Sequence, residues 1–313
     1  MFKEQNMTSH DCVAIVRRAI GIKRVGHTGT LDPMATGVLP ICIGRAARIM
    51  DYTDLDKKEY EVELKFGIET DTLDIWGEVT KEENVAEIPE ETVLEGIKKF
   101  QGEIQQIPPK YSALKVNGKK LYEYARENKE VEIKSRNVTV FKIELIDMNF
   151  PYLKLRVLCS KGTYIRSICR DLGQELGTVA TMTSLKRTKS GLFDWQDGIN
   201  IMDIKSMNKE ELEEKLINTD YPLINFGKIL LTEKATKDFL NGKQLSIDYF
   251  EIISDGIDNR YNVYGFDIWN LNEVETSSDE SKDSDNGYKY NKEAFVGVGI
   301  IKNGHLKVDK VLY

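Results

Sequence analysis

Hydrophobic and polar residues alternate strictly between residues 59 and 67. A period of two predicts a β-strand with one buried face and one exposed face. The buried face is expected to carry Tyr60, Val62, Leu64 and Phe66. Two further apolar stretches, 138–146 and 152–159, flank a turn at residues 149–151, which predicts a pair of antiparallel strands.

Two other stretches have the spacing of amphipathic helices. In the first, Thr8 and Asp11 form a capping box, apolar residues then recur at helical spacing, and Gly21 follows as a C-terminal cap. The second runs over residues 165–176, with one apolar stripe that leaves out Arg166. A cation near a helix N-terminus gains nothing from the helix dipole. We therefore expect Arg166 to have an acidic partner.

A helix over 90–101 and a strand over 38–43 complete an α+β pattern in the first part of the chain. Near residue 228 the sequence pattern changes, and this change predicts two domains, 1–227 and 228–313. The second contains closing strands at 295–300 and 306–312. Its residues 270–293 are acidic, rich in Ser and Asn and almost free of apolar side chains, which predicts a mobile insertion.

The distribution of charge matters more than its total. The 313 residues carry a formal net charge of −7. Residues 1–50 hold seven Lys or Arg against three Asp or Glu, and residues 153–190 hold eight against two, whereas residues 248–293 hold four against twelve. RNA affinity depends on local basic surface, so this distribution is compatible with RNA binding.

Composition also sets the expected compartment. No apolar run approaches the roughly 20 residues that cross a bilayer, and the first residues contain no signal-peptide stretch. The cysteines have no metal-ligand spacing, so we expect reduced thiols in a cytoplasmic protein without a membrane segment or a metal site. They are Cys12, Cys42, Cys159 and Cys169.

The most informative stretch is Gly26 to Pro40, which reads Gly-His-Thr-Gly-Thr-Leu-Asp-Pro-Met-Ala-Thr-Gly-Val-Leu-Pro. Its glycines permit positive φ or close approach to the backbone, and Pro33 restricts Asp32 to extended conformations. A carboxylate held on such a loop before a buried strand can be aimed at a substrate. A simple Asp-Pro turn is the alternative reading of an isolated Leu-Asp-Pro.

The whole stretch resembles the signature of the TruB-type pseudouridine synthases, with Asp32 in the place of the nucleophile. Three other segments resemble motifs of the same family: Pro-Pro-Lys-Tyr-Ser-Ala-Leu-Lys at 108–115, Lys-Gly-Thr-Tyr-Ile-Arg at 161–166, and the segment 182–191. The resemblance is strong over 7–74 and 108–191. It implies the pseudouridine-synthase fold, a mixed and mostly antiparallel sheet flanked by helices. More weakly, it implies a small C-terminal PUA-like β domain that binds RNA.

The resemblance also assigns residues to a site. It implies that Tyr60 stacks against the target base, that Arg166 pairs with Asp32, and that Asp74 lies near them. Tyr164 would pack near the base and Leu185 beneath it. The alternatives from the residues alone are core packing for Tyr60 and turn capping for Asp74.

Further candidates for substrate binding have open alternatives. His27 would fill the space that a flipped base leaves, or be structural. Tyr111 and Lys115 would contact RNA, or belong to a rigid Pro-Pro connector. Arg48 would contact phosphate, or be solvated.

The implied activity is isomerisation of uridine-55 in the T loop of tRNA to pseudouridine. It requires base flipping and an aspartate nucleophile, and no metal or cofactor. The expected partner is the T stem-loop of tRNA, bound by a monomer. A non-catalytic RNA-binding or RNA-folding module of the same fold is one alternative. A small-molecule enzyme with a phosphate loop is another, but the glycine stretch lacks the Walker lysine and the dinucleotide spacing.

The chain departs from the family at its start. TruB-type enzymes usually have an apolar strand and Lys-Pro-x-Gly before Thr-Ser. Here Lys3-Glu4-Gln5-Asn6 stands in that place, and no apolar strand precedes it. A missing strand would leave a sheet edge unpaired, so we expect an exposed edge there and, with it, low stability, low activity or a tendency to associate through that edge.

Overall fold

The computed structural model describes residues 1–52, 57–266 and 293–312 of the chain. The chain forms two compact units. One comprises Met1–Ile41 and Asp54–Leu212, and the other comprises Cys42–Thr53 and Glu213–Tyr313. The sequence predicts a domain boundary between residues 227 and 228, which stays a prediction. The acidic insertion expected at 270–293 falls almost wholly outside the described residues, which resume at Glu293.

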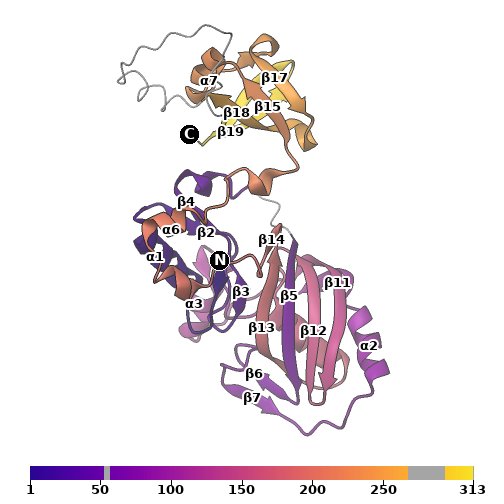
Figure 1. The fold of residues 1–313 in the computed structure, drawn as a ribbon. Coiled ribbons are helices and arrows are strands. Elements are labelled where there is room, and N and C mark those ends of the chain that lie inside the picture. The colour runs from indigo at the N-terminus through magenta and orange to yellow at the C-terminus, as the bar shows by residue number, and fades with distance from the viewer. Residues whose placement is uncertain (53–56, 267–292, 313) are drawn as a thin grey trace, which may run out of the picture. The chain divides into compact units, whose positions relative to one another are not determined.

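The first unit is built on one sheet, in the order β1-β3-β13-β5-β12-β11-β8, with β14 paired to β13 (Figure 1). Among the described strand pairs of this sheet, β13 and β3 are the one parallel pair. The strands are β1 (Phe2–Lys3), β3 (Thr36–Val38), β13 (Ala180–Ser190), β5 (Lys57–Phe66), β12 (Tyr152–Ser160), β11 (Arg136–Asn149), β8 (Gly102–Gln106) and β14 (Phe193–Asp194). The mixed, mostly antiparallel sheet that the sequence predicts is confirmed.

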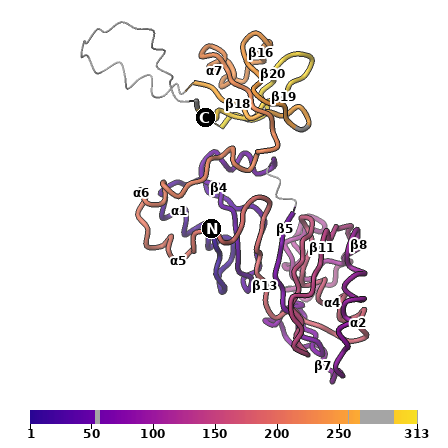
Figure 2. The backbone as a smooth tube through the Cα atoms, turned by 45° about the vertical axis from the view of Figure 1, so that its right-hand side comes forward, coloured from indigo at the N-terminus to yellow at the C-terminus, as the bar shows by residue number. Residues whose placement is uncertain are grey.

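Helices flank this sheet, and Figure 2 shows α2 and α4 on one of its faces. The helices of the unit are α1 (Ser9–Ile20), α2 (Glu90–Lys98), α3 (Leu121–Arg126), α4 (Ile165–Glu175) and α5 (Ile201–Ile204). Short strands complete it: β2 (Val25–His27), β6 (Ile68–Thr70), β7 (Val79–Glu82), β9 (Lys115–Val116) and β10 (Lys119–Lys120). The capping box of Thr8 and Asp11 and the left-handed Gly21 cap of α1 are both present, as predicted.

The alternating strand is also confirmed. Strand β5 buries Tyr60, Val62, Leu64 and Phe66, and pairs antiparallel with β12 on one side and β13 on the other. These side chains are at most 7% exposed and face the core because alternate residues of a strand share a face. The strand predicted over 38–43 is wrong as a single element: β3 ends at Val38 and β4 (Ile41–Ile43) begins after Pro40. Pro40 has no N–H to donate to a ladder, which favours an interruption there.

The exposed sheet edge expected at the start of the chain is also wrong. Residues Phe2 and Lys3 pair antiparallel with Val38 and Gly37, so β1 covers the edge of β3. Phe2 N–H donates in turn to the Ile199 carbonyl at 2.7 Å. Asn6, which stands where the family has glycine, takes φ 63°, a left-handed conformation that asparagine tolerates better than most residues.

Gly37 is required where β3 meets β13. Its φ is +113°, and a Cβ there would lie 2.2 Å from the Arg187 carbonyl oxygen. Gly37→Ala should therefore lower the free energy of unfolding by about 3 kcal/mol or more, measured by urea denaturation. Gly21→Ala is the matched control: its φ is +72° but no atom lies within 4 Å of the added Cβ. It should cost only about 1–2 kcal/mol. Equal losses would mean that the contact with β13 is not tight.

The second unit contains a six-stranded sheet in the order β16-β20-β19-β18-β15-β17. Its elements are β15 (Gly227–Leu231), α7 (Glu233–Leu240), β16 (Leu245–Ser246), β17 (Phe250–Ser254), β18 (Arg260–Phe266), β19 (Glu293–Lys302) and β20 (His305–Val311), with short 3₁₀ turns at Gly44–Arg48, Tyr221–Leu223, Ile247–Tyr249 and Ile257–Asn259. Helix α6 (Lys209–Glu213) lies at the boundary along the chain. Ile49 joins this unit because it packs in a cluster with Leu223, Val298 and Leu312.

Candidate active site

Asp32 lies on the loop between β2 and β3, here called the Asp32 loop (residues 28–35). Helix α1 holds this loop through Ser9: the Leu31 N–H donates to Ser9 Oγ at 2.9 Å, and Ser9 Oγ donates to the Leu31 carbonyl at 3.2 Å. A backbone bond from Ala35 N–H to the Asp32 carbonyl closes the turn at 3.0 Å. The Asp32 side chain is 34% exposed, so its carboxylate is fixed in position and still reachable from solvent.

Arg166, in the first turn of α4, is the centre of an ionic cluster. Its Nη2 lies 3.0 Å from Asp32 Oδ2, and its Nη1 lies 3.5 Å from Asp74 Oδ2. The same guanidinium donates to the carbonyls of Thr72 at 2.9 Å and Tyr111 at 3.1 Å. Only 6% of its side chain is exposed. The acidic partner expected from the sequence is therefore present, and a second carboxylate accompanies it.

Asp74 is the buried member of this cluster. Burial raises the pKa of its carboxyl above the ordinary 3.8, and the charge of Arg166 opposes that rise. Its Oδ1 accepts from the Thr72 hydroxyl at 2.9 Å and from the Trp76 N–H at 3.1 Å. Each oxygen of the carboxylate thus has partners, one oxygen towards Arg166 and the other towards its own turn.

Tyr60 and Leu185 lie on one face of the sheet beside the cluster. Tyr60 pairs across the strands with Arg187, and Leu185 pairs with Val62, so these side chains share a face of β5 and β13. Tyr60 and Leu185 are each 7% exposed. Burial raises the pKa of the Tyr60 phenol, and the charge of Arg187 opposes that rise.

Two buried cations lie against the Asp32 loop and its flanks. Arg187 donates from Nε to the Val38 carbonyl at 2.8 Å and from Nη2 to the Gly29 carbonyl at 3.1 Å. Lys3 Nζ donates to the carbonyls of Ala35, Glu4 and Pro33 at 2.6, 2.9 and 3.4 Å. Both residues are 0% exposed. Neither role is apparent from the sequence, because lysine and arginine are rarely fully buried.

The comparisons with known proteins decide the family. The model of the TruB family pseudouridylate synthase N-terminal domain matches residues 17–165, and that of the tRNA pseudouridylate synthase B C-terminal domain matches residues 166–223. The chain belongs to the TruB family. It is therefore a tRNA pseudouridine synthase, an isomerase that acts on tRNA.

Curated relatives of the TruB family agree over most of the chain. The tRNA pseudouridine synthase B of Clostridium tetani is 47% identical over 242 residues, covering 77% of this chain and 83% of the relative. That of Clostridium novyi is 36% identical over 314 residues, covering 100% and 98%. Among solved structures, a Cbf5–Nop10–Gar1 complex matches with TM-score 0.68 and 22% identity, covering 100% of this chain and 83% of that chain, which supports the fold alone.

A substitution of Lys3 tests how much its buried ammonium stabilises the Asp32 loop. Lys3→Met should lower the free energy of unfolding by about 1–3 kcal/mol, because buried carbonyls lose their donor. Burial lowers the pKa of Lys3 from 10.5 to about 8. The unfolded chain then binds more protons than the folded chain between these values, so the contribution of Lys3 to stability rises with pH across this window. In urea denaturation, the deficit of Lys3→Met should be larger at about pH 9 than at about pH 7. Equal deficits would contradict a buried ammonium.

Two other residues of the TruB motifs lie in the same unit. Tyr164 precedes α4, and its backbone N–H and carbonyl both bond to the Gln106 side chain, at 2.8 and 3.0 Å. His27 ends β2, with its ring 5.5 Å from that of His10 in an edge-on arrangement. Burial lowers the pKa of His27. Its Nδ1 is buried and has no hydrogen-bond partner among the described residues.

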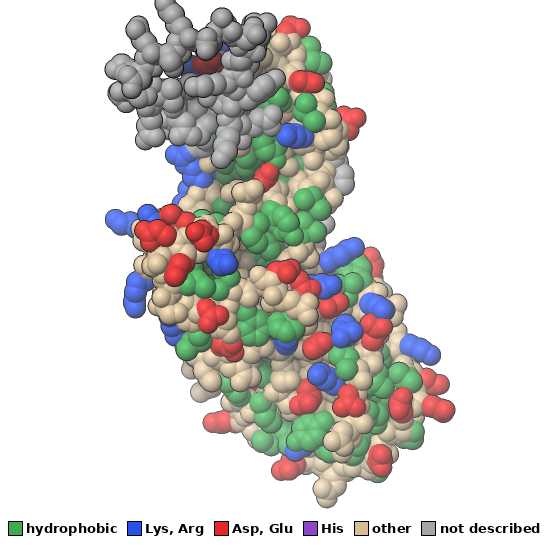
Figure 3. All heavy atoms as spheres, in the orientation of Figure 1, with side chains coloured by type: hydrophobic (Ala, Val, Ile, Leu, Met, Phe, Trp, Pro, Cys, Tyr) green, Lys and Arg blue, Asp and Glu red, His purple; other side chains and the backbone are tan. Residues whose placement is uncertain are grey.

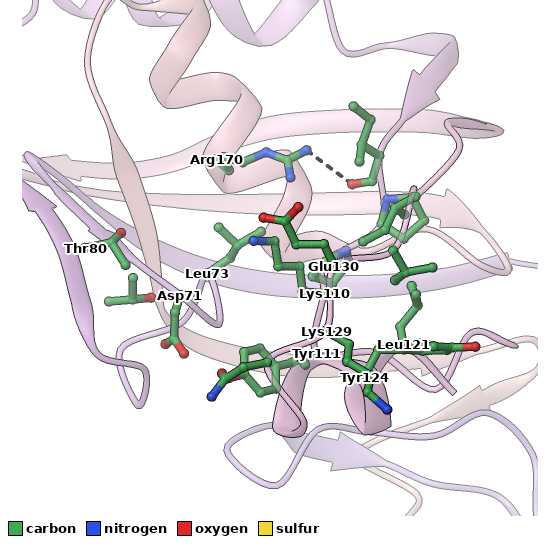
Figure 4. A pocket seen from close by; sticks show the side chains of 18 of the residues that line it. Asp71, Leu73, Thr80, Lys110, Tyr111, Leu121, Tyr124, Lys129, Glu130 and Arg170 are labelled. Atoms are coloured by element: carbon green, nitrogen blue, oxygen red, sulfur yellow. Dashed lines mark hydrogen bonds between the residues drawn. The ribbon is translucent and has the colours of Figure 1, made fainter. Parts of the chain in front are cut away.

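Tyr111 connects the ionic cluster to a cavity. The cavity measures about 970 Å³ and is lined by the Asp71 turn and by parts of the segment 107–133 (Figure 4). Tyr111 and Asp71 both line it, and the carboxylate of Asp71 contributes to raising the pKa of the Tyr111 phenol, behind burial as the main cause. Asp32, Tyr60 and Arg166 are not among the lining residues, so the cavity adjoins the cluster without containing it.

Two of the expected RNA contacts are not brought to this cluster. Lys115 is exposed on β9, which pairs with β10. Arg48 belongs to the second unit, where its Nη1 donates to the Val311 carbonyl at 2.8 Å. In the described residues, no group of three or more His, Cys, Asp or Glu has the arrangement of a metal site, and no helix is long and apolar enough to span a membrane.

The basic excess of residues 153–190 is largely neutralised or buried in the fold. Arg166 and Arg187 are buried, while Arg156 pairs with Glu61 at 3.0 Å. On the face in Figure 3, acidic and basic side chains are interspersed over the sheet of the first unit. In contrast, exposed cations without an ion pair to another described residue gather at the end of α1 and just after it: Arg17, Arg18, Lys23 and Arg24.

Proposed function

We propose that this enzyme isomerises uridine-55 in the T loop of tRNA to pseudouridine, with Asp32 as the nucleophile. The observation that supports this proposal is the ionic cluster. In it, the Asp32 carboxylate is about one-third exposed and is held 3.0 Å from the buried guanidinium of Arg166. A carboxylate suits the reaction because it can form a covalent adduct and then leave. Arg166 would hold Asp32 ionised and aimed, and Asp74 would hold Arg166 from the other side.

The reaction rearranges bonds within one nucleotide. The bond between N1 and the ribose carbon C1′ breaks, and a bond between C5 and C1′ forms. C5 loses a proton, and N1 gains one. Atoms and electrons balance without an oxidant or reductant, so the side chains at hand are sufficient.

The uridine must leave its stack to reach Asp32, at a cost of roughly a few kcal/mol. Stacking on Tyr60, worth about 1–3 kcal/mol, would offset part of this cost. Leu185 lies on the same sheet face as Tyr60 and would contact the base from beneath, while Tyr164 would pack beside it. His27, with its unpaired and buried Nδ1, would occupy the space that the base leaves in the T loop.

The remaining RNA contacts are proposed at the periphery. Tyr111, Lys115 and Arg48 would contact the T stem-loop, Asp74 acting only through Arg166. The PUA-like region from residue 228 onwards would bind RNA outside the T loop. The enzyme would act as a cytoplasmic monomer.

Tritium release tests the proposal. A tRNA transcript carrying uridine labelled at C5 should release label in proportion to pseudouridine formed, and a transcript with cytidine at position 55 should release none. Release that persists with cytidine at position 55 would place the reaction at another uridine. No release from either transcript would refute the proposed activity.

A further inference from the structure

The turn that follows β6 exposes two large apolar side chains beside the ionic cluster. Trp76 is 52% exposed and Ile75 is 43% exposed. Trp76 makes no ring contact with another described residue. An indole this exposed is unusual, because tryptophan is highly buried on average in folded proteins.

The turn beneath Trp76 is tightly held. Ile75 N–H donates to the Met182 carbonyl at 2.9 Å, and Gly77 N–H donates to the Asp74 carbonyl at 3.1 Å. A Cβ at Gly77 would lie 2.3 Å from Thr72 Oγ1, so the chain is compact here. Leu73 adopts φ 63°, a left-handed conformation that costs a non-glycine residue about 1–2 kcal/mol. Such local strain is found where a surrounding structure imposes a geometry for function.

The turn is also connected to the ionic cluster through the carboxylate of Asp74. Asp74 Oδ2 lies 3.5 Å from Arg166 Nη1, while Asp74 Oδ1 accepts the Trp76 N–H at 3.1 Å. Arg166 in turn lies 3.0 Å from Asp32. The backbone of Trp76 is thus separated from the nucleophile by two side chains, and the indole extends from that point into solvent.

We infer that Trp76 is a stacking platform for an unpaired base of the T loop that neighbours the flipped uridine. The inference rests on the proposed function and deepens it. The ligand is a nucleobase rather than a protein partner because the Trp76 N–H is bonded to Asp74 of the ionic cluster, where the proposed function places the RNA. Every base also presents a flat π-face to an aromatic ring. A rigid turn means that little conformational entropy is lost when the base docks.

The test is a binding experiment that separates stacking from catalysis. In an Asp32→Asn background, Trp76→Ala should weaken binding of a fluorescent T stem-loop RNA about 5- to 150-fold, the equivalent of about 1–3 kcal/mol. Trp76→Phe should retain most of the affinity. Tyr152→Ala is the matched control, because Tyr152 is also an exposed aromatic residue. Tyr152 pairs with Lys65, which lies five residues along β5 from Tyr60. Its affinity should equal that of the parent.

A double-mutant cycle identifies the partner base. T stem-loops that each lack one loop base are titrated against parent and Trp76→Ala. For one position, loss of the base should weaken the parent as much as Trp76→Ala does, and combining the two changes should cost nothing more. Strictly additive effects at every position, or unchanged affinity of Trp76→Ala, would overturn the inference. A parent that binds no T stem-loop, together with no tritium release from the enzyme with Asp32 intact, would instead refute the proposed function.

Turnover gives the second readout. With Asp32 intact, Trp76→Ala should raise KM by a similar factor and leave kcat at saturating RNA within about twofold. A fall in kcat with unchanged KM would mean that Trp76 supports the cluster through its backbone turn and does not stack on RNA.

Discussion

Asp32→Asn should reduce pseudouridine formation by at least about 10⁴-fold, because a neutral amide of the same size is a poor nucleophile. Stability should change by less than about 1 kcal/mol. The Asp32 side chain is 34% exposed, so its ion pair with Arg166 is partly screened, and Arg166 keeps Asp74 as a partner. The measurements are tritium release and thermal unfolding of the same preparations.

Asp11→Asn provides the contrasting control for this variant. Asp11 accepts from the Thr8 N–H at 2.7 Å in the capping box of α1, and it makes no hydrogen bond or ion pair with Asp32, Asp74 or Arg166. Its replacement should cost up to about 1 kcal/mol of stability and leave turnover near that of wild type. Turnover of Asp32→Asn above background would remove Asp32 from the proposed role. An equal loss of turnover in Asp11→Asn would show that the assay follows stability.

Local patterns predicted the elements that their own residues determine. The alternation around Tyr60 predicted β5, because the side-chain period of a strand follows from backbone geometry alone. The capping box predicted where α1 begins, because its hydrogen bonds join residues only three apart. The partner of Arg166 could be expected because a cation in the first turn of a helix is electrostatically out of place.

Long-range contacts account for the parts that pattern reading missed. Lys3 reads as a surface residue, yet two of the carbonyls that its ammonium binds, those of Pro33 and Ala35, lie 30 and 32 positions away in sequence. The pairing of Phe2 with Val38 is similarly remote in sequence. The polar stretch around it therefore predicts no strand, although a two-residue strand is present. Ile49 packs in the second unit against Leu223, Val298 and Leu312, which are more than 170 positions away in sequence. Nothing within a few residues of these positions encodes such contacts.

Arg166→Met should be the most damaging single change at the cluster. Methionine fills most of the space but donates no hydrogen bond, so two carboxylates and two carbonyls lose their partner. Removing one member of a buried pair costs about 3–5 kcal/mol, because the remaining charge is uncompensated. Turnover should fall by about 10³-fold or more, since Asp32 is no longer aimed. Chemical denaturation and tritium release measure the two losses.

The remaining buried charge can be identified by a second substitution and by pH. Burial already raises the pKa of Asp74, and without Arg166 it should rise further. A folded-state pKa above the unfolded value means that the folded chain binds more protons, so stability falls as pH rises through that window. The deficit of Arg166→Met should therefore be smaller near pH 5 than near pH 8.

Adding Asp74→Asn should recover part of the lost stability at pH 8, whereas adding Asp32→Asn should recover less, because Asp32 is 34% exposed and Asp74 only 10%. A deficit that is independent of pH and is not relieved by Asp74→Asn would mean that the loss arises from the carbonyls of Thr72 and Tyr111.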